Sequence, residues 1–219
     1  MKRKKILITG GAGFIGHHVI YNLLNETDCQ IISLDRLDYS GSYSRIQQII
    51  EKNDNWKQRV KIIWHDLKAE INPLTVSKIN NPDIILHLAA ASHVDRSIVD
   101  PMSFVLDNIV GTVNLLNYAR GLDTFEKFIY FSTDEVFGPA PSNIKYKEND
   151  RYNSGNPYAA SKAGAEEMCV AFKNTYKLPI IITHTMNVLG ERQHPEKYLP
   201  KIINYILNKK TLTIHSNKN

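Results

Sequence analysis

The segment Thr9-Gly10-Gly11-Ala12-Gly13-Phe14-Ile15-Gly16 decides the fold. It follows an apolar run at residues 5–9 and precedes a helical pattern over residues 14–25. Glycines spaced by three permit a tight turn, close approach of the backbone to a ligand, and close packing of the helix on the strand. Strand, glycine turn and helix in this order predict a Rossmann-type unit that presents backbone N–H groups to an anion.

Short apolar runs alternate with longer amphipathic stretches along the rest of the chain, which predicts an α/β fold with a doubly wound parallel sheet. The predicted strands cover residues 5–9, 30–35, 60–64, 83–88, 127–132 and 179–184, and the predicted helices cover residues 14–25, 101–120 and 156–176. Polar, turn-rich stretches at residues 53–58 and 139–155 are predicted loops.

The glycine turn and the residue that ends the second strand together predict NAD as the cofactor. Gly10, Gly13, Phe14, Ile15 and Gly16 are the predicted pyrophosphate contacts. Asp35 lies about 20 residues after the turn, where a carboxylate accepts hydrogen bonds from the adenosine ribose.

Two neighbouring residues leave alternatives open. Arg36, beside Asp35, could instead accept the 2′-phosphate of NADP. Asp66 is either an adenine contact or an ordinary turn residue at the end of the third strand.

The composition argues against several other classes of protein. Of the net charge of +5 over 219 residues, four charges come from Lys2, Arg3, Lys4 and Lys5, so we expect no nucleic-acid partner. No apolar run approaches the ~18 residues that span a bilayer, so we expect no membrane insertion. Cys29 and Cys169 form no metal or disulfide motif. A cytoplasmic enzyme without a metal is predicted.

The catalytic candidates follow the fifth strand. Tyr158 and Lys162 are one helical turn apart, and a lysine near a phenol favours the phenolate, which can accept a proton from a hydroxyl. A Tyr-x-x-x-Lys match is expected about once by chance in this composition, and Tyr205 with Lys209 is a second match. Only Tyr158 follows a strand that ends in a polar run, Ser132-Thr133-Asp134-Glu135.

Several motifs together resemble the extended short-chain dehydrogenase/reductase family of nucleotide-sugar enzymes. They are the glycine turn, His87-Leu88-Ala89-Ala90, Asn108, Ser132-Thr133 and Tyr158 to Lys162. Within that family, residues 90–97, 132–138 and 195–197 are similar to the nucleoside-diphosphate-glucose 4,6-dehydratases. The Asp134-Glu135 pair distinguishes the glucose dehydratases from their relatives. Related epimerases and decarboxylases usually carry other residues there, and GDP-mannose dehydratases usually carry Ser-Glu.

The resemblance implies a role for each of these residues. Tyr158 would take the proton of the sugar 4-hydroxyl with Thr133 at the same oxygen, Glu135 would remove the C5 proton, and a protonated Asp134 would donate to the departing 6-hydroxyl. A neighbouring carboxylate in a dry site would favour protonated Asp134. The alternative is that Asp134 and Glu135 only cap the strand end in water.

The resemblance also implies further contacts. The expected cofactor contacts are Asp66, Leu67, Leu88, Ala89, Ala90, Asn108, Tyr158 and Lys162. The expected substrate contacts are Ser97, Thr133, Asn187, Glu196 and Lys197. A homodimer through a four-helix interface that includes the Tyr158 helix is expected as well.

Length and three substitutions depart from the family pattern. Ala91, Phe137 and Leu189 stand where the family carries glutamate, tyrosine and tyrosine. These substitutions weaken the prediction of which sugar nucleotide the protein binds. Family members usually continue for about another hundred residues. We therefore expect a Rossmann domain at residues 1–190 and, at residues 191–219, only the start of a smaller C-terminal substrate domain, with a strand at residues 211–215.

Two other functions remain open at this point. A 4-epimerase or a decarboxylase of the same family begins with the same oxidation at C4. A non-catalytic NAD-binding sensor would keep the fold without the chemistry, although it would have no need for a tyrosine beside a lysine.

Overall fold

A six-stranded parallel sheet forms the centre of the fold in the computed structural model, which describes residues 3–211. The strand order is β3-β2-β1-β4-β5-β6, and every neighbouring pair is parallel. The strands are β1 (Lys5–Thr9), β2 (Gln30–Asp35), β3 (Val60–Trp64), β4 (Ile84–His87), β5 (Lys127–Thr133) and β6 (Ile180–Thr185). All six predicted strands are confirmed, and so is the doubly wound Rossmann-type order.

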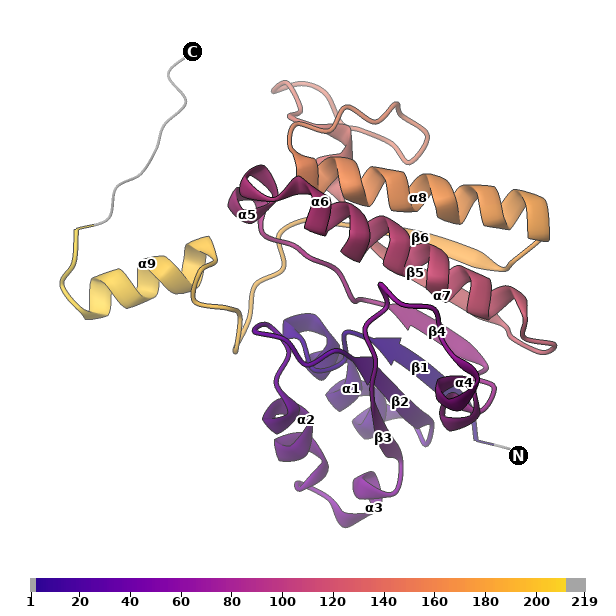
Figure 1. Cartoon of the computed structure of the whole chain (residues 1–219). Helices are drawn as coiled ribbons and strands as arrows, with labels where there is room; N and C mark the ends of the chain where they lie inside the picture. The colour runs from indigo at the N-terminus through magenta and orange to yellow at the C-terminus, as the bar shows by residue number, and fades with distance from the viewer. Residues whose placement is uncertain (1–2, 212–219) are drawn as a thin grey trace. The chain divides into compact units, whose positions relative to one another are not determined.

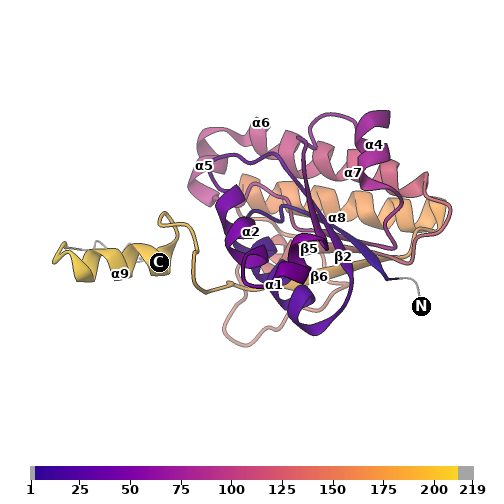
Figure 2. The same ribbon diagram turned by 90° about the horizontal axis from the view of Figure 1, so that it is seen from below.

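Helices cover both faces of the sheet, and alternation along β1 divides the core between them (Figure 1). Ile6 and Ile8 pack with α1 (Phe14–Glu26), α2 (Tyr43–Ile50) and α3 (Asp54–Lys57) on one face. Leu7 points to the other face, where α4 (Pro73–Ile79), α7 (Gly111–Arg120) and α8 (Pro157–Tyr176) pack. The second view shows α7 and α8 running side by side (Figure 2).

The chain between β4 and β5 is helical at residues 94–99 and 101–120, but the helix is not regular. It contains α5 (Val94–Val99), α6 (Pro101–Phe104), a π-helical turn η1 (Val105–Val110), and α7. The helix predicted at residues 101–120 is therefore confirmed in extent, although its middle is wound more loosely. Single π turns inside helices are frequent at functional sites because they re-aim side chains.

Some elements differ from the prediction. Helices α2, α4, α5 and α9 (Tyr198–Leu207) were not predicted. The loop predicted at residues 53–58 is wrong, because α3 occupies it: the Asn53 side chain caps the turn by accepting from Asn55 N at 3.0 Å, and Trp56 is buried. Residues 212–215 of the predicted last strand lie outside the described residues.

The chain divides into two compact units, residues 1–186 and 187–219, and each is described by itself. The first contains the sheet with its flanking helices, and the second contains α9.

Candidate functional site

The glycine turn lies between β1 and α1, at the point where the strand order reverses. Gly10 has φ +71°, and its carbonyl accepts from Gly13 N at 3.0 Å. A Cβ on Gly16 would lie 2.6 Å from Gly11 Cα and closer still to the Gly10 carbonyl oxygen. Among the residues that the structure describes, no side chain caps the N-terminus of α1. The turn therefore presents free helix N–H groups, which fits a pyrophosphate.

Asp35 is fixed beside this turn. Its carboxylate accepts from Ala12 N at 3.0 Å and from Leu37 N at 2.8 Å, so the end of β2 is tied to the glycine turn. Burial raises the pKa of Asp35, while the two backbone donors oppose the shift. The position fits the predicted ribose acceptor.

The predicted adenine contacts follow β3. The Asp66 carboxylate accepts from Lys68 N at 3.0 Å and lies 3.4 Å from Lys68 Nζ, so it closes a turn. Leu67 is buried, and its carbonyl accepts from Asn114 at 2.7 Å. The structure thus shows the turn role of Asp66, and its adenine contact stays a prediction.

A chain of buried hydrogen bonds supports the end of β4. Thr112 Oγ1 donates to the Asn108 carbonyl at 2.5 Å, so it must accept from His87 Nε2, 2.9 Å away. His87 Nδ1 then accepts from the Thr9 hydroxyl at 2.7 Å, which in turn accepts from Ala89 N at 3.2 Å. Burial lowers the pKa of His87 to about 3, with the Lys162 charge adding to the shift. A neutral imidazole holds Ala89 in place.

Asn108 joins three parts of the site. Its amide bonds both backbone groups of Ala91, at 2.8 and 3.0 Å, and donates to Ser161 Oγ at 2.8 Å. The predicted cofactor residue is thus a buried brace between the loop after β4 and helix α8. Leu88, Ala89 and Ala90 run along this braced loop.

The polar run after β5 forms a short 3₁₀ turn, η2 (Asp134–Phe137). Thr133 is buried, and its hydroxyl accepts from Glu135 N at 3.3 Å and lies 3.3 Å from Asp134 Oδ1. Asn156, the residue that caps α8, donates to Glu135 Oε2 at 3.2 Å. Asp134 is exposed, whereas the sequence predicts a dry site for it.

Tyr158 and Lys162 lie in the first two turns of α8, beside the end of β5. Burial and the Glu135 charge raise the pKa of Tyr158 to about 12, although a hydrogen bond with Thr133 acts to lower this pKa. The sequence predicts a pKa lowered by Lys162, and the structure shows the opposite direction. Lys162 Nζ donates to the Phe131 carbonyl at 2.6 Å, and burial lowers its own pKa to about 8.

Ser97 positions Tyr158. It is fully buried, and its hydroxyl donates to the Val94 carbonyl at 2.6 Å and accepts from Tyr158 N at 3.1 Å. In the structure this hydroxyl bonds the start of α8, and the predicted sugar contact of Ser97 stays a prediction.

Sequence reasoning missed Glu166, which lies at the centre of a buried network. Its carboxylate accepts from Tyr152 Oη at 2.7 Å and from Ser132 Oγ, and it pairs with His184 Nε2 at 2.8 Å. Helical spacing could have found it, because Glu166 is four residues after Lys162 and eight after Tyr158, on the same helix face. The network ties α8 to the ends of β5 and β6.

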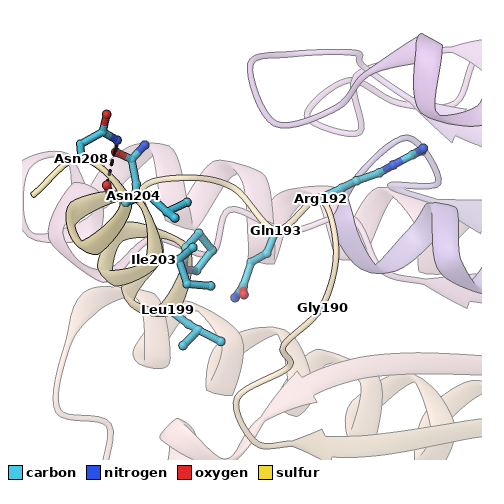
Figure 3. Close-up of a pocket in the computed structure, with 9 residues that line it drawn as sticks. Gly190, Arg192, Gln193, Leu199, Ile203, Asn204 and Asn208 are labelled. Atoms are coloured by element: carbon cyan, nitrogen blue, oxygen red, sulfur yellow. Dashed lines mark hydrogen bonds between the residues drawn. The ribbon is translucent and has the colours of Figure 1, made fainter.

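The predicted substrate residues Asn187, Glu196 and Lys197 belong to the second unit. Glu196 lies 3.3 Å from His194 Nδ1, and Lys197 precedes α9. A cavity of about 360 Å³ lies within this unit. Figure 3 shows Leu199 and Ile203 of α9 on one side of it and Gln193 on the other. The three substrate contacts stay predictions.

Within residues 3–211, no helix is long and apolar enough to cross a bilayer. No group of three or more His, Cys, Asp or Glu side chains within that range could hold a metal ion.

The doubly wound parallel sheet, the glycine turn after β1 and the Tyr158–Lys162 helix after β5 define the short-chain dehydrogenase/reductase class. The chain belongs to the family described as GDP-mannose 4,6 dehydratase, which it matches over residues 7–216.

Several curated relatives carry dehydratase names. The chain is 40% identical to dTDP-D-glucose 4,6-dehydratase of Dictyostelium discoideum, over 97% of this chain and 50% of that protein. It is 38% identical to dTDP-glucose 4,6-dehydratase of Escherichia coli, over 97% of this chain and 62% of that protein. The chain thus spans less than two thirds of the length of these relatives.

Solved structures include both dehydratases and epimerases. DesIV, a dTDP-glucose 4,6-dehydratase from Streptomyces venezuelae with NAD and TYD bound, has a TM-score of 0.86 and 34% identity over 95% of this chain and 63% of that one. UDP-glucuronic acid 4-epimerase from Bacillus cereus, with UDP-glucuronic acid and NAD, has a TM-score of 0.85 and 28% identity over 97% and 66%. The fold is common to both reactions.

Proposed function

We propose that this chain forms the cofactor-binding and catalytic part of an NAD-dependent nucleotide-sugar 4,6-dehydratase. The observation that carries the proposal is the η2 turn, where an exposed Asp134 and an anchored Glu135 follow Thr133 at the strand end beside Tyr158. Epimerases share the fold, so the fold itself does not select between the two reactions. The pair of carboxylates supports the dehydratase, because elimination of water needs both a base and an acid.

NAD would be held by the glycine turn, with Asp35 on the ribose and the loop from Leu88 to Ala90 beside it. The free N–H groups of α1 and the close backbone packing at Gly16 support this placement. When bound, NAD supplies the hydride acceptor for C4 of the sugar and later returns the hydride to C6.

The chain's own residues would move the protons. Tyr158 would accept the proton of the 4-hydroxyl, with Thr133 hydrogen-bonded to the same oxygen, as the hydride leaves C4 for NAD, and a ketone results at C4. This role requires Tyr158 to be ionised in the complex, whereas burial raises its pKa to about 12 in the chain alone. The ketone acidifies C5, and Glu135 removes the C5 proton. Asp134, in its protonated form, donates a proton to the 6-hydroxyl, which leaves as water and creates a C5=C6 double bond. Return of the hydride to C6 and of the proton from Glu135 to C5 then gives the 4-keto-6-deoxy sugar.

The substrate class in this proposal is a nucleoside diphosphoglucose. The names of the curated relatives support dTDP-glucose, with UDP-glucose as the alternative. The family description names GDP-mannose, but the Asp134-Glu135 pair agrees better with the glucose enzymes. Asn187, Glu196 and Lys197 are the proposed contacts for the sugar and its phosphates.

Product masses test the proposal. The protein, extended at its C-terminus to the length of its relatives, is incubated separately with dTDP-glucose and UDP-glucose, beside an Asp134→Asn, Glu135→Gln double variant. Loss of about 18 mass units in the unmodified protein alone supports the dehydratase and names its nucleotide. Conversion to an epimer of unchanged mass contradicts it in favour of the epimerase, and bound NAD without conversion favours the sensor.

We also propose a cytoplasmic homodimer. Free, buried Cys29 and Cys169 support a reducing compartment. Ile98, Val99 and Met102 of α5 and α6 are exposed apolar side chains on the helices that pack on α8, which supports a self-association surface there. Light scattering of a Met102→Lys variant tests the dimer, and a monomer in the unmodified protein contradicts it.

A further inference from the structure

Arg36 stands where a basic residue could admit NADP. It directly follows Asp35, the predicted ribose contact, and a guanidinium near this point can accommodate a 2′-phosphate. Whether Arg36 can do so depends on what already holds its guanidinium.

Two carboxylates occupy the guanidinium. Asp107 binds it in a bidentate manner, with Nη1 2.6 Å from Oδ1 and Nη2 2.9 Å from Oδ2. Asp38 accepts from Nε at 2.7 Å. These hydrogen bonds raise the pKa of Arg36, with the bond to Asp107 as the largest cause. Paired planar contacts of this kind are among the stronger charged interactions in proteins.

Asp107 reaches Arg36 from a distant part of the chain. It lies 71 residues later, in the π-helical turn η1, and its side chain is only 11% exposed. The adjacent Asn108 is locked to Ala91 and Ser161, so the backbone that carries Asp107 is fixed. The clamp is therefore built by the tertiary structure.

The charges around Arg36 also disfavour a second phosphate. Asp66 Oδ1 lies 3.9 Å from Arg36 Nη1, and Lys68 Nζ lies 3.9 Å from Asp107 Oδ1. Together with Asp38, three carboxylates pair with the two cations Arg36 and Lys68, so this group carries one net negative charge. A 2′-phosphate dianion brought here would meet repulsion and would have to displace Asp107.

We propose that Asp107, by clamping Arg36, makes the chain select NAD over NADP. The inference rests on the proposed function, since it assumes that a nicotinamide dinucleotide occupies the glycine turn. Asp107 acts as a specificity-determining residue that need not touch the cofactor.

Direct binding measurements test the clamp without any turnover. Calorimetry gives the dissociation constants of NAD and NADP for the unmodified chain, Asp107→Ala, Asp107→Asn, and the Arg36→Ala, Asp107→Ala double variant. AMP and adenosine 2′,5′-bisphosphate serve as probes that isolate the 2′-phosphate. Asp95→Ala, an exposed residue of α5, controls for the loss of one negative charge.

The expected result is that NAD binds more tightly than NADP to the unmodified chain, and that Asp107→Ala narrows the ratio by about tenfold, or 1.4 kcal/mol. The double variant and Asp95→Ala should restore or keep the original ratio. Asp107→Asn, which keeps the shape of the side chain, should narrow it less and stands in if the alanine variant does not fold.

An unchanged ratio in folded Asp107 variants overturns the inference, and so does a gain for NADP that survives removal of Arg36. If the unmodified chain, folded by circular dichroism, binds neither dinucleotide, the proposed function fails first. If it binds NADP as tightly as NAD, only the clamp fails.

Discussion

Asn156 joins the cap of α8 to the carboxylate of Glu135. Its side-chain oxygen accepts from Ala159 N at 2.8 Å, while its amide nitrogen donates to Glu135 Oε2 at 3.2 Å. Tyr158 is two residues further along the same helix. One side chain thus fixes the distance between the proposed C5 base and the proposed 4-hydroxyl base.

Substitutions of Asn156 should separate stability from the elimination step. Asn156→Ala loses the cap and should lower the free energy of unfolding by about 1 kcal/mol. Asn156→Ser keeps a capping oxygen but loses the amide donor, so unfolding should change little while dehydration slows. Thermal melts and product formation measure the two effects. Equal dehydration rates in the serine variant and the unmodified protein would refute the link to Glu135.

Gly16 should tolerate no side chain. A Cβ there would collide with backbone atoms of Gly10 and Gly11, which cannot yield without opening the turn, so Gly16→Ala should lower stability by about 2 kcal/mol or more and abolish NAD binding. Gly155→Ala is the matched control, since nothing lies within 4 Å of a Cβ there. That variant should be neutral or slightly stabilising by about 0.4–1 kcal/mol. Unimpaired NAD binding by Gly16→Ala would contradict the placement.

Acid should destabilise the fold through His87. Its folded pKa of about 3 lies below the unfolded value of about 6.5, so the unfolded state binds the extra proton between these values. The contribution of neutral His87 to the free energy of unfolding is complete above about pH 6.5. It is lost as pH falls toward 3, at about 1.4 kcal/mol per pH unit.

Urea unfolding at several pH values measures this slope. His87→Gln, which can keep one donor and one acceptor, should flatten the slope over that window. His194→Gln, in the second unit, should not. An unchanged slope in His87→Gln would show that other groups carry the acid sensitivity.

Lys162 should lower the free energy of unfolding while it serves the proposed reaction. Because burial lowers its pKa to about 8 from 10.5, the cost of its buried charge is present at pH 7 and declines as pH rises from 8 to 10.5. Lys162→Met should therefore raise the free energy of unfolding at pH 7 by about 1–3 kcal/mol while abolishing oxidation at C4. Chemical denaturation and cofactor reduction measure the two effects. A destabilised methionine variant would mean that the bond to the Phe131 carbonyl outweighs burial.

The Glu166 network should hold the 139–156 loop in place. Tyr152 of that loop donates to Glu166, and Phe137 and Tyr146 pack beside it. Glu166→Ala should cost about 3–5 kcal/mol and open the loop to proteolysis, because it leaves His184 and Ser132 unpaired. Glu166→Gln, which keeps the size and an acceptor, should recover part of the stability. Equal protease resistance of the loop in Glu166→Ala and in the unmodified protein would contradict this role of Glu166.

Most of the sheet was predictable from the sequence, and much of the connecting structure was not. The strands carry consecutive β-branched or aromatic residues because both faces of a parallel sheet are buried, and that signal is local. Helix α3 was hidden because four residues give no periodicity, and only the burial of Trp56 reveals its packing. The π turn at Val105–Val110 likewise gave no signal that we could find in the sequence, and its Asn108 bonds Ala91, which lies in a different segment.

The sequence by itself determined the Rossmann order and the glycine turn, because each depends on residues close together in the chain. It also predicted the site residues Asp35, Thr133, Asp134, Glu135, Tyr158 and Lys162. Only the tertiary structure decided which groups those residues meet. Burial, a property of the whole fold, raised the pKa of Tyr158 where the spacing to Lys162 alone predicted a fall. Arg36 met Asp107, and Ser132 met Glu166, at sequence separations of 71 and 34 residues. Such pairs form only when parallel strands end at one edge of a sheet and helices from distant segments pack against it.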